Sequence, residues 1–161
     1  MLTDSGFLQF DTGAASHPGH VRSHNEDSFL TRPDCGLWVV ADGMGGHAAG
    51  DVASGLIVAE LNSVGIPGSL EDLTARFHER LSRAHAAILA HSAALGGAVV
   101  GSTIVALLAC EDRFSCIWSG DSRAYLLRGG ALRPLTRDHS VVQERVDRGD
   151  LTPAEAVSHP E

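Results

Sequence analysis

The middle of the chain carries apolar residues at helical spacing, and strand-like segments lie on both sides of it. The helical pattern covers residues 49–61 and 70–95. The strand-like segments, which are joined by short turns, are 28–32, 36–42, 102–110, 113–120 and 123–130. A parallel doubly wound sheet needs strict alternation of strands and helices, and this order lacks it. It therefore predicts an α+β fold with helices packed on antiparallel sheets.

Weaker patterns predict further elements at the two ends. Weak alternation predicts a strand over residues 7–13, and residues 131–136 can add a short one. The strands after the helices are expected to form an antiparallel meander, because their turns are short.

Capping residues indicate where the helices begin. Ser69 with Asp72 resembles a capping box at the start of the second helix. A third helix is expected over residues 138–150, with Asp138 as its N-cap in the simplest interpretation. A fourth should begin at Thr152, where Glu155 closes the capping box.

Composition limits the class of protein. The chain has 161 residues and 43% hydrophobic content, which predicts one globular domain over 1–161. A net charge of −8 argues against nucleic-acid binding. No apolar run is long enough to span a membrane, and the N-terminus does not resemble a signal peptide. We therefore expect a cytoplasmic protein, acting as a monomer, whose three cysteines are reduced core thiols.

The stretch "VVADGMGGHAAG" (39–50) permits two interpretations. Its glycines fit a dinucleotide-binding loop between a strand and a helix. However, a second helix follows where a parallel strand is needed, and Asp42 would repel a pyrophosphate. An Asp-Gly pair at a strand end can instead offer oxygen ligands to Mg²⁺ or Mn²⁺. The metal interpretation is therefore favoured.

Other polar residues support a metal site for a phosphate substrate. Glu26 and Asp27 precede a strand, and Asp121 lies in a turn between two strands. Arg22 is suited to binding phosphate with its guanidinium fork. Each residue also has an ordinary interpretation: Asp121 is a common hairpin-turn residue, Arg22 a surface arginine, and His47 a helix-start residue. The metal hypothesis depends on their combination.

Five motifs in order resemble one known family. They are "VRSHNEDSF", "VVADGMGGHAAGDVAS", "GSTIVALL", "WSGDSRAYLLRGGALRPLTRDHS" and the closing "HPE". This set is similar to the metal-dependent protein phosphatases (PPM, type 2C) in their bacterial form. The resemblance implies a four-layer αββα sandwich, with two antiparallel sheets flanked by helices. Because the family's core continues further, it also implies that this chain is the N-terminal two-thirds and lacks the last strands.

The resemblance also assigns site residues. It implies that Asp42 bridges two Mn or Mg ions, Gly43 binds one through its carbonyl, and Glu26 holds the other. Asp27 would support a metal-bound water, and Arg22 would bind the substrate phosphate. Asp121 would help to hold a third, weaker ion.

The implied reaction is hydrolysis of phosphoserine or phosphothreonine in a protein substrate by a metal-activated water. A bacterial Ser/Thr kinase would be the functional counterpart. Met44 stands where some members carry a proton-donating His, so the general acid is open. Two later metal-binding aspartates of the family have no counterpart here, which predicts weak metal binding and low activity for the isolated chain. The alternative is an inactive pseudophosphatase or phosphoprotein-binding module.

Overall fold

The computed structural model describes residues 9–45 and 49–156. Strands and helices follow one another in the predicted order, with two strands before two helices, five strands after them, and two short helices last. The elements are β1 Asp27–Arg32, β2 Leu37–Gly45, α1 Ala49–Asn62, α2 Leu70–Ala94, β3 Val100–Ser102, β4 Ile104–Cys110, β5 Arg113–Ser119, β6 Tyr125–Arg128, β7 Ala131–Pro134, α3 Val141–Arg148 and α4 Pro153–Ala156. The α+β prediction with antiparallel sheets is confirmed.

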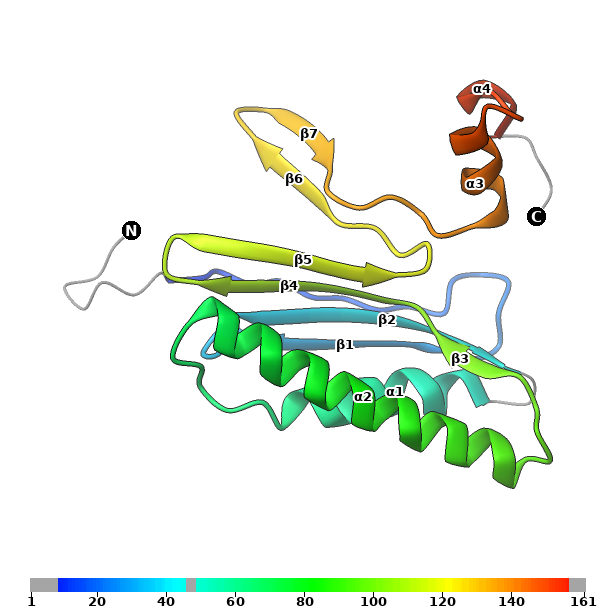
Figure 1. Ribbon diagram of the computed structural model, residues 1–161, viewed down its shortest axis with the longest axis horizontal. Coiled ribbons are helices and arrows are strands. Elements are labelled where there is room, and N and C mark those ends of the chain that lie inside the picture. Colours follow the sequence, from blue (N-terminus) through cyan, green and yellow to red (C-terminus); the bar gives the residue numbers. More distant parts are fainter. Residues whose placement is uncertain (1–8, 46–48, 157–161) are drawn as a thin grey trace.

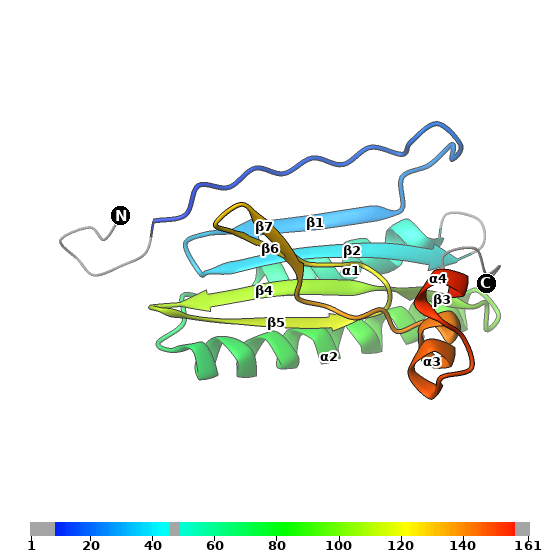
Figure 2. The same ribbon diagram turned by 90° about the horizontal axis from the view of Figure 1, so that it is seen from above.

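Five strands form one antiparallel sheet in the order β1-β2-β4-β5, and β3 pairs with the far end of β2. Helices α1 and α2 cover one face of this sheet (Figure 1). The hairpin of β6 and β7 lies on the opposite side, over the sheet (Figures 1 and 2). The sheet is therefore the central layer, and its strand ends at one edge are available to carry a site.

The hydrophobic core lies between the sheet and the two helices. Alternate residues of β2 and β4 point inward, because side chains of a strand alternate between its faces. They pack against fully buried residues of the helices, among them Leu61, Leu73 and Phe77. Burying a side chain such as that of Phe77 contributes roughly 2–3 kcal/mol. This packing fixes the sheet against α1 and α2.

One predicted strand and one predicted strand pairing are wrong. The described part of 7–13 forms no strand, whereas residues 7 and 8 lie outside the described residues. This segment is held by side chains: Trp38 donates its Nε1–H to Thr12 Oγ1 at 3.1 Å, and its ring lies 4.7 Å from that of Phe10. The predicted meander also stops at β5, because β6 pairs with β7 in a separate two-stranded sheet.

The helix predictions hold with one correction. Helix α2 begins after Ser69, whose side chain accepts the Asp72 N–H as predicted. Helix α3 begins later than predicted, and its N-cap is Ser140. Asp138 is not the cap, because its carboxylate forms a two-pronged ion pair with Arg123 at 2.8 and 2.6 Å.

Cys35, Cys110 and Cys116 are free thiols, as expected. At α4, Thr152 and Glu155 bond reciprocally in the predicted capping box. Within the described ranges, none of the helices has the length and apolar character needed to cross a bilayer.

Candidate active site

The candidate site is built on a row of residues that crosses the sheet. Asp27 of β1 lies directly opposite Asp42 of β2. On the other side of β2, the pairs Val40–Val105 and Gly43–Ser102 share one register, so Thr103 faces Asp42. Opposed side chains in antiparallel strands have Cβ atoms about 5 Å apart. Strand pairing therefore brings two carboxylates together that are distant in sequence.

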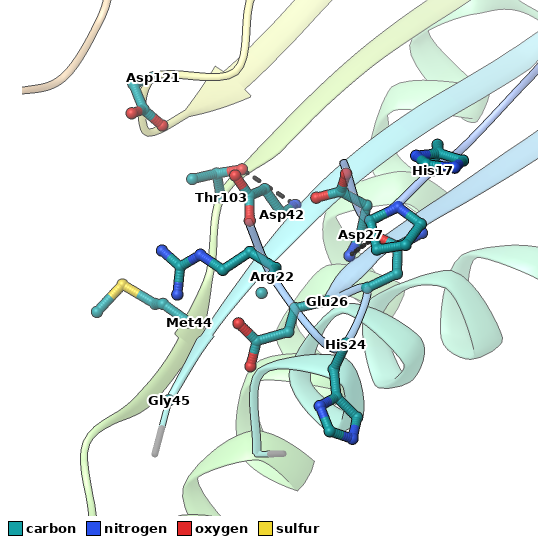
Figure 3. Close-up of a pocket in the computed structure, with 13 residues that line it drawn as sticks. His17, Arg22, His24, Glu26, Asp27, Asp42, Met44, Gly45, Thr103 and Asp121 are labelled. Carbon is teal, nitrogen blue, oxygen red and sulfur yellow. Dashed lines mark hydrogen bonds between the residues drawn. The ribbon is translucent and has the colours of Figure 1, made fainter. Parts of the chain in front are cut away.

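These residues line a cavity of about 530 Å³ at the end of the sheet. Figure 3 shows the Asp27, Asp42 and Glu26 side chains around it, with Arg22 beside Met44 and Asp121 farther along the rim. The lining residues include every residue of the predicted site, namely Arg22, Glu26, Asp27, Asp42, Gly43 and Asp121. The structure thus brings the predicted residues to one cavity.

The cavity concentrates negative charge. The pKa of Asp42 is raised, first by partial burial and then by the charges of Asp27 and Asp121. Asp42 remains exposed to the solvent in the cavity, where the carboxylates of Asp27, Asp121 and Glu26 surround it. Like charges placed directly opposite each other in a sheet are destabilising. Such an arrangement favours binding of a cation.

Two glycines allow helix α1 to approach Glu26 and β2. A Cβ on Gly43 would lie 1.9 Å from the Gly50 carbonyl oxygen, and one on Gly50 would lie 2.5 Å from Glu26 Oε1. The Glu26 carboxylate therefore sits against the first turn of α1, where the helix dipole favours an anion. The predicted helix-start residue His47 lies outside the described residues.

A buried serine holds the Glu26 backbone. Ser54 of α1 is fully buried and donates its hydroxyl to the Glu26 carbonyl oxygen at 2.6 Å. The same carbonyl accepts the Gly43 N–H at 3.1 Å. Helix α1 and strand β2 thereby fix the backbone that carries Glu26 and Asp27.

Asp121 lies just after β5, in the connection that leaves the sheet. The strands on either side of it, β5 and β6, are not paired, so this connection is not a tight hairpin. Gly120 has a φ of 106°, a left-handed conformation that favours glycine. The Gly120 carbonyl accepts the His139 N–H at 2.9 Å. The Arg123–Asp138 ion pair holds the chain just beyond it, and Arg123 lowers the pKa of Asp138. The turn carrying Asp121 is therefore supported from two sides.

The donor chemistry fits a hard divalent cation, since Mg²⁺ and Mn²⁺ prefer carboxylate and carbonyl oxygens. Glu26, Asp27, Asp42 and Asp121 supply four carboxylates to the cavity. However, in the described part of the chain, no three His, Cys, Asp or Glu side chains converge closely enough to hold an ion. The residues fit such an ion in chemistry, and they do not form a closed cage.

Sequence reasoning assigned no role to four polar residues that line the cavity, namely His17, His24, Asn25 and Thr103. His17 and His24 line the cavity and are exposed to the solvent. Thr103 lies in the recognised stretch "GSTIVALL" without an assigned task. Once β2 is paired with β4, the shared register places Thr103 opposite Asp42, which is the signal that could have found it.

Comparison with known proteins decides the family. A sequence model described as protein phosphatase 2C matches residues 14–145. The chain belongs to this family. It is 42% identical over 151 residues to the serine/threonine protein phosphatase PstP of Mycobacterium tuberculosis. That match covers 92% of the chain but only 29% of PstP.

Solved structures share the fold of the chain. PppA, a regulatory component of the type VI secretion system of Pseudomonas aeruginosa, matches with a TM-score of 0.80 and 47% identity, over 84% of this chain and 59% of PppA. The catalytic domain of PstP in complex with two manganese ions matches with a TM-score of 0.77 and 39% identity, over 88% of this chain and 61% of that domain. The chain thus spans about three fifths of the length of each of these two solved structures.

Proposed function

We propose that this chain carries part of the active site of a protein serine/threonine phosphatase that hydrolyses phosphoserine and phosphothreonine. The observation that carries the proposal is the opposition of Asp27 and Asp42 at a cavity that Glu26, Asp121 and Arg22 also line. Family membership supports the same reaction. The protein substrate is a phosphoprotein, and a bacterial Ser/Thr kinase is the functional counterpart.

Each residue has a specific task in this proposal. Asp42, Glu26, the Gly43 carbonyl and Asp121 would hold two Mn²⁺ or Mg²⁺ ions and a third, weaker one. When bound, such ions neutralise phosphate charge and acidify water. Arg22 binds the phosphate of the substrate with its guanidinium fork. Asp27 accepts a hydrogen bond from the attacking water and orients it.

The same proposal covers the architecture of the whole domain. The hairpin of β6 and β7 lies over the sheet face that α1 and α2 leave open (Figure 2). That face exposes the apolar side chains of Phe29 and Val40. We infer a four-layer αββα sandwich in which this hairpin belongs to the second sheet.

The test is phosphate release from a phosphothreonine peptide by the complete gene product with Mn²⁺. The wild-type protein should release phosphate, and Asp42→Asn should reduce the rate at least about 100-fold, because it removes charge where ions and phosphate meet. Absence of release with both Mn²⁺ and Mg²⁺ contradicts the proposal. Phosphopeptide binding without release would instead support a binding module.

A further inference from the structure

Thr103 lies between the two segments that carry Asp42 and Asp121. The register of β2 with β3 and β4 places it opposite Asp42. The pairing of Ile104 with Ser119 between β4 and β5 continues to Thr103 and Gly120. One threonine therefore neighbours both of these acidic positions along the row that crosses the sheet.

The Thr103 hydroxyl takes a place in the strand ladder that a backbone carbonyl would normally occupy. Thr103 donates its N–H to the Asp42 carbonyl at 2.8 Å, as a paired residue should. In return, the Asp42 N–H donates to Thr103 Oγ1 at 3.2 Å. The freed Thr103 carbonyl accepts the Ser102 hydroxyl at 2.8 Å. This exchange accounts for the break between β3 and β4.

The same side chain contacts the turn that carries Asp121. Thr103 Oγ1 lies 2.7 Å from Ser122 Oγ, within hydrogen-bond distance. The methyl group faces Gly120, where a Cβ would lie 2.6 Å from Thr103 Cγ2. A side chain at residue 120 would therefore push Thr103 away from Asp42.

We propose that Thr103 is a positioning residue that fixes the Asp121 turn relative to Asp42. The inference rests on the proposed function, because the two carboxylates it aligns are those assigned to the cations. Its hydroxyl accepts a hydrogen bond from the Asp42 N–H on one side and lies within hydrogen-bond distance of the Ser122 hydroxyl on the other. One side chain therefore links the backbone of Asp42 to the turn that carries Asp121. It also gives the "GST" stretch (101–103) a task that the proposed reaction leaves unassigned.

The first arm of the test needs no metal. Hydrogen exchange is measured by mass spectrometry on peptides covering residues 37–45 and 119–125 of the metal-free chain. Thr103→Val keeps the shape but removes the hydroxyl, whereas Thr103→Ser keeps the hydroxyl. Thr74→Val is the control for the same substitution away from the site, where the threonine hydroxyl donates one hydrogen bond, to the Leu70 carbonyl at 2.8 Å on α2.

Thr103→Val should speed exchange in both peptides by about fivefold, which is the effect of losing a hydrogen bond worth about 1 kcal/mol. Thr103→Ser and Thr74→Val should leave these peptides as in the wild type. Ser122→Ala should speed hydrogen exchange only in the peptide that covers residues 119–125. If Thr103→Val does not fold, Ser122→Ala takes its place as the variant that tests the proposal. Unchanged exchange in Thr103→Val, or equal changes in Thr74→Val, overturns the proposal.

The second arm is a Mn²⁺ titration as a double-mutant cycle. Asp121→Asn should weaken binding in the wild type but add little in the Thr103→Val background, because the turn is already displaced. Additive effects overturn the proposal. If the wild type binds no Mn²⁺ at all, the proposed function fails, and the exchange arm alone still decides the position of Thr103.

Discussion

Asp27 and Asp42 lie directly opposite each other on adjacent antiparallel strands, at the end of the sheet where helix α1 begins. The pairing costs stability in the absence of a cation, because two carboxylates repel each other at this spacing. A bound divalent ion would convert that cost into a favourable interaction. Removing one of the two carboxylates should therefore stabilise the metal-free protein but weaken the stabilisation that a bound cation gives.

Asp27→Asn should stabilise the metal-free protein by about 0.2–1 kcal/mol, because it removes the repulsion from Asp42. The same change should reduce the increase in melting temperature that Mn²⁺ produces. Chemical denaturation in EDTA and thermal melting with Mn²⁺ measure the two effects. Asp112→Asn, in the turn between β4 and β5, is the control and should show neither effect. A destabilised variant that retains the full Mn²⁺ response would refute this prediction.

Gly43→Ala should be strongly destabilising, because its Cβ would lie 1.9 Å from the Gly50 carbonyl oxygen and the backbone cannot move aside cheaply. We expect a loss of at least about 2 kcal/mol in the free energy of unfolding. Gly55→Ala is the matched control in the interior of α1, where a Cβ meets no atom within 4 Å. It should stabilise the helix by about 0.5–1 kcal/mol. Similar effects of the two changes would show that α1 does not pack as closely as described.

Ser54→Ala should cost about 1 kcal/mol, because the buried hydroxyl bonds the Glu26 carbonyl. The larger consequence should be weaker Mn²⁺ binding, since the backbone of Glu26 and Asp27 loses its link to α1. Ser63→Ala removes a comparable but exposed hydrogen bond, to the Glu60 carbonyl, and serves as the control. Equal Mn²⁺ affinities of the wild type and Ser54→Ala would contradict the assigned positioning.

Asp34, in the turn between β1 and β2, should make the stability of the protein depend on pH. Its hydrogen bond with Arg32 lowers the pKa of Asp34 to about 2. A carboxyl with a lowered folded-state pKa stabilises the protein above its unfolded pKa and loses that contribution as the pH falls through the folded value. Asp34→Asn should thus be less stable than the wild type at pH 6, by no more than about 1 kcal/mol for this exposed pair. The difference should vanish towards pH 2. A difference that is constant over this range, measured by urea denaturation, would contradict the ion pair.

Much of the fold could be predicted because local signals agreed with tertiary packing. Two helices could be predicted from the apolar periodicity of residues 49–61 and 70–95 and from the Ser69 cap. The antiparallel pairing of β1 with β2 could be predicted from the short turn between them. The strand predicted at 7–13 failed because Trp38 anchors this segment through side chains, which alternation cannot reveal.

The site was predictable in residue types but not in geometry. Asp42, Glu26 and Asp27 stand out as acids at strand ends, whereas Thr103 acquires its position only through pairing in the sheet. Asp138 illustrates the same limit: its sequence context suits an N-cap, but Arg123 lies close enough in space to pair with it. Long-range pairing decides both cases, and one sequence does not contain that information.

The most direct measurement is Mn²⁺ binding by this chain, followed through the electron paramagnetic resonance signal of the free ion. The wild-type chain should remove Mn²⁺ from solution, and Asp42→Asn should abolish this uptake. Asp112→Asn should bind Mn²⁺ as the wild type does. An equal free-ion signal with the wild type and Asp42→Asn would contradict the claim that the carboxylates of this cavity form a cation site.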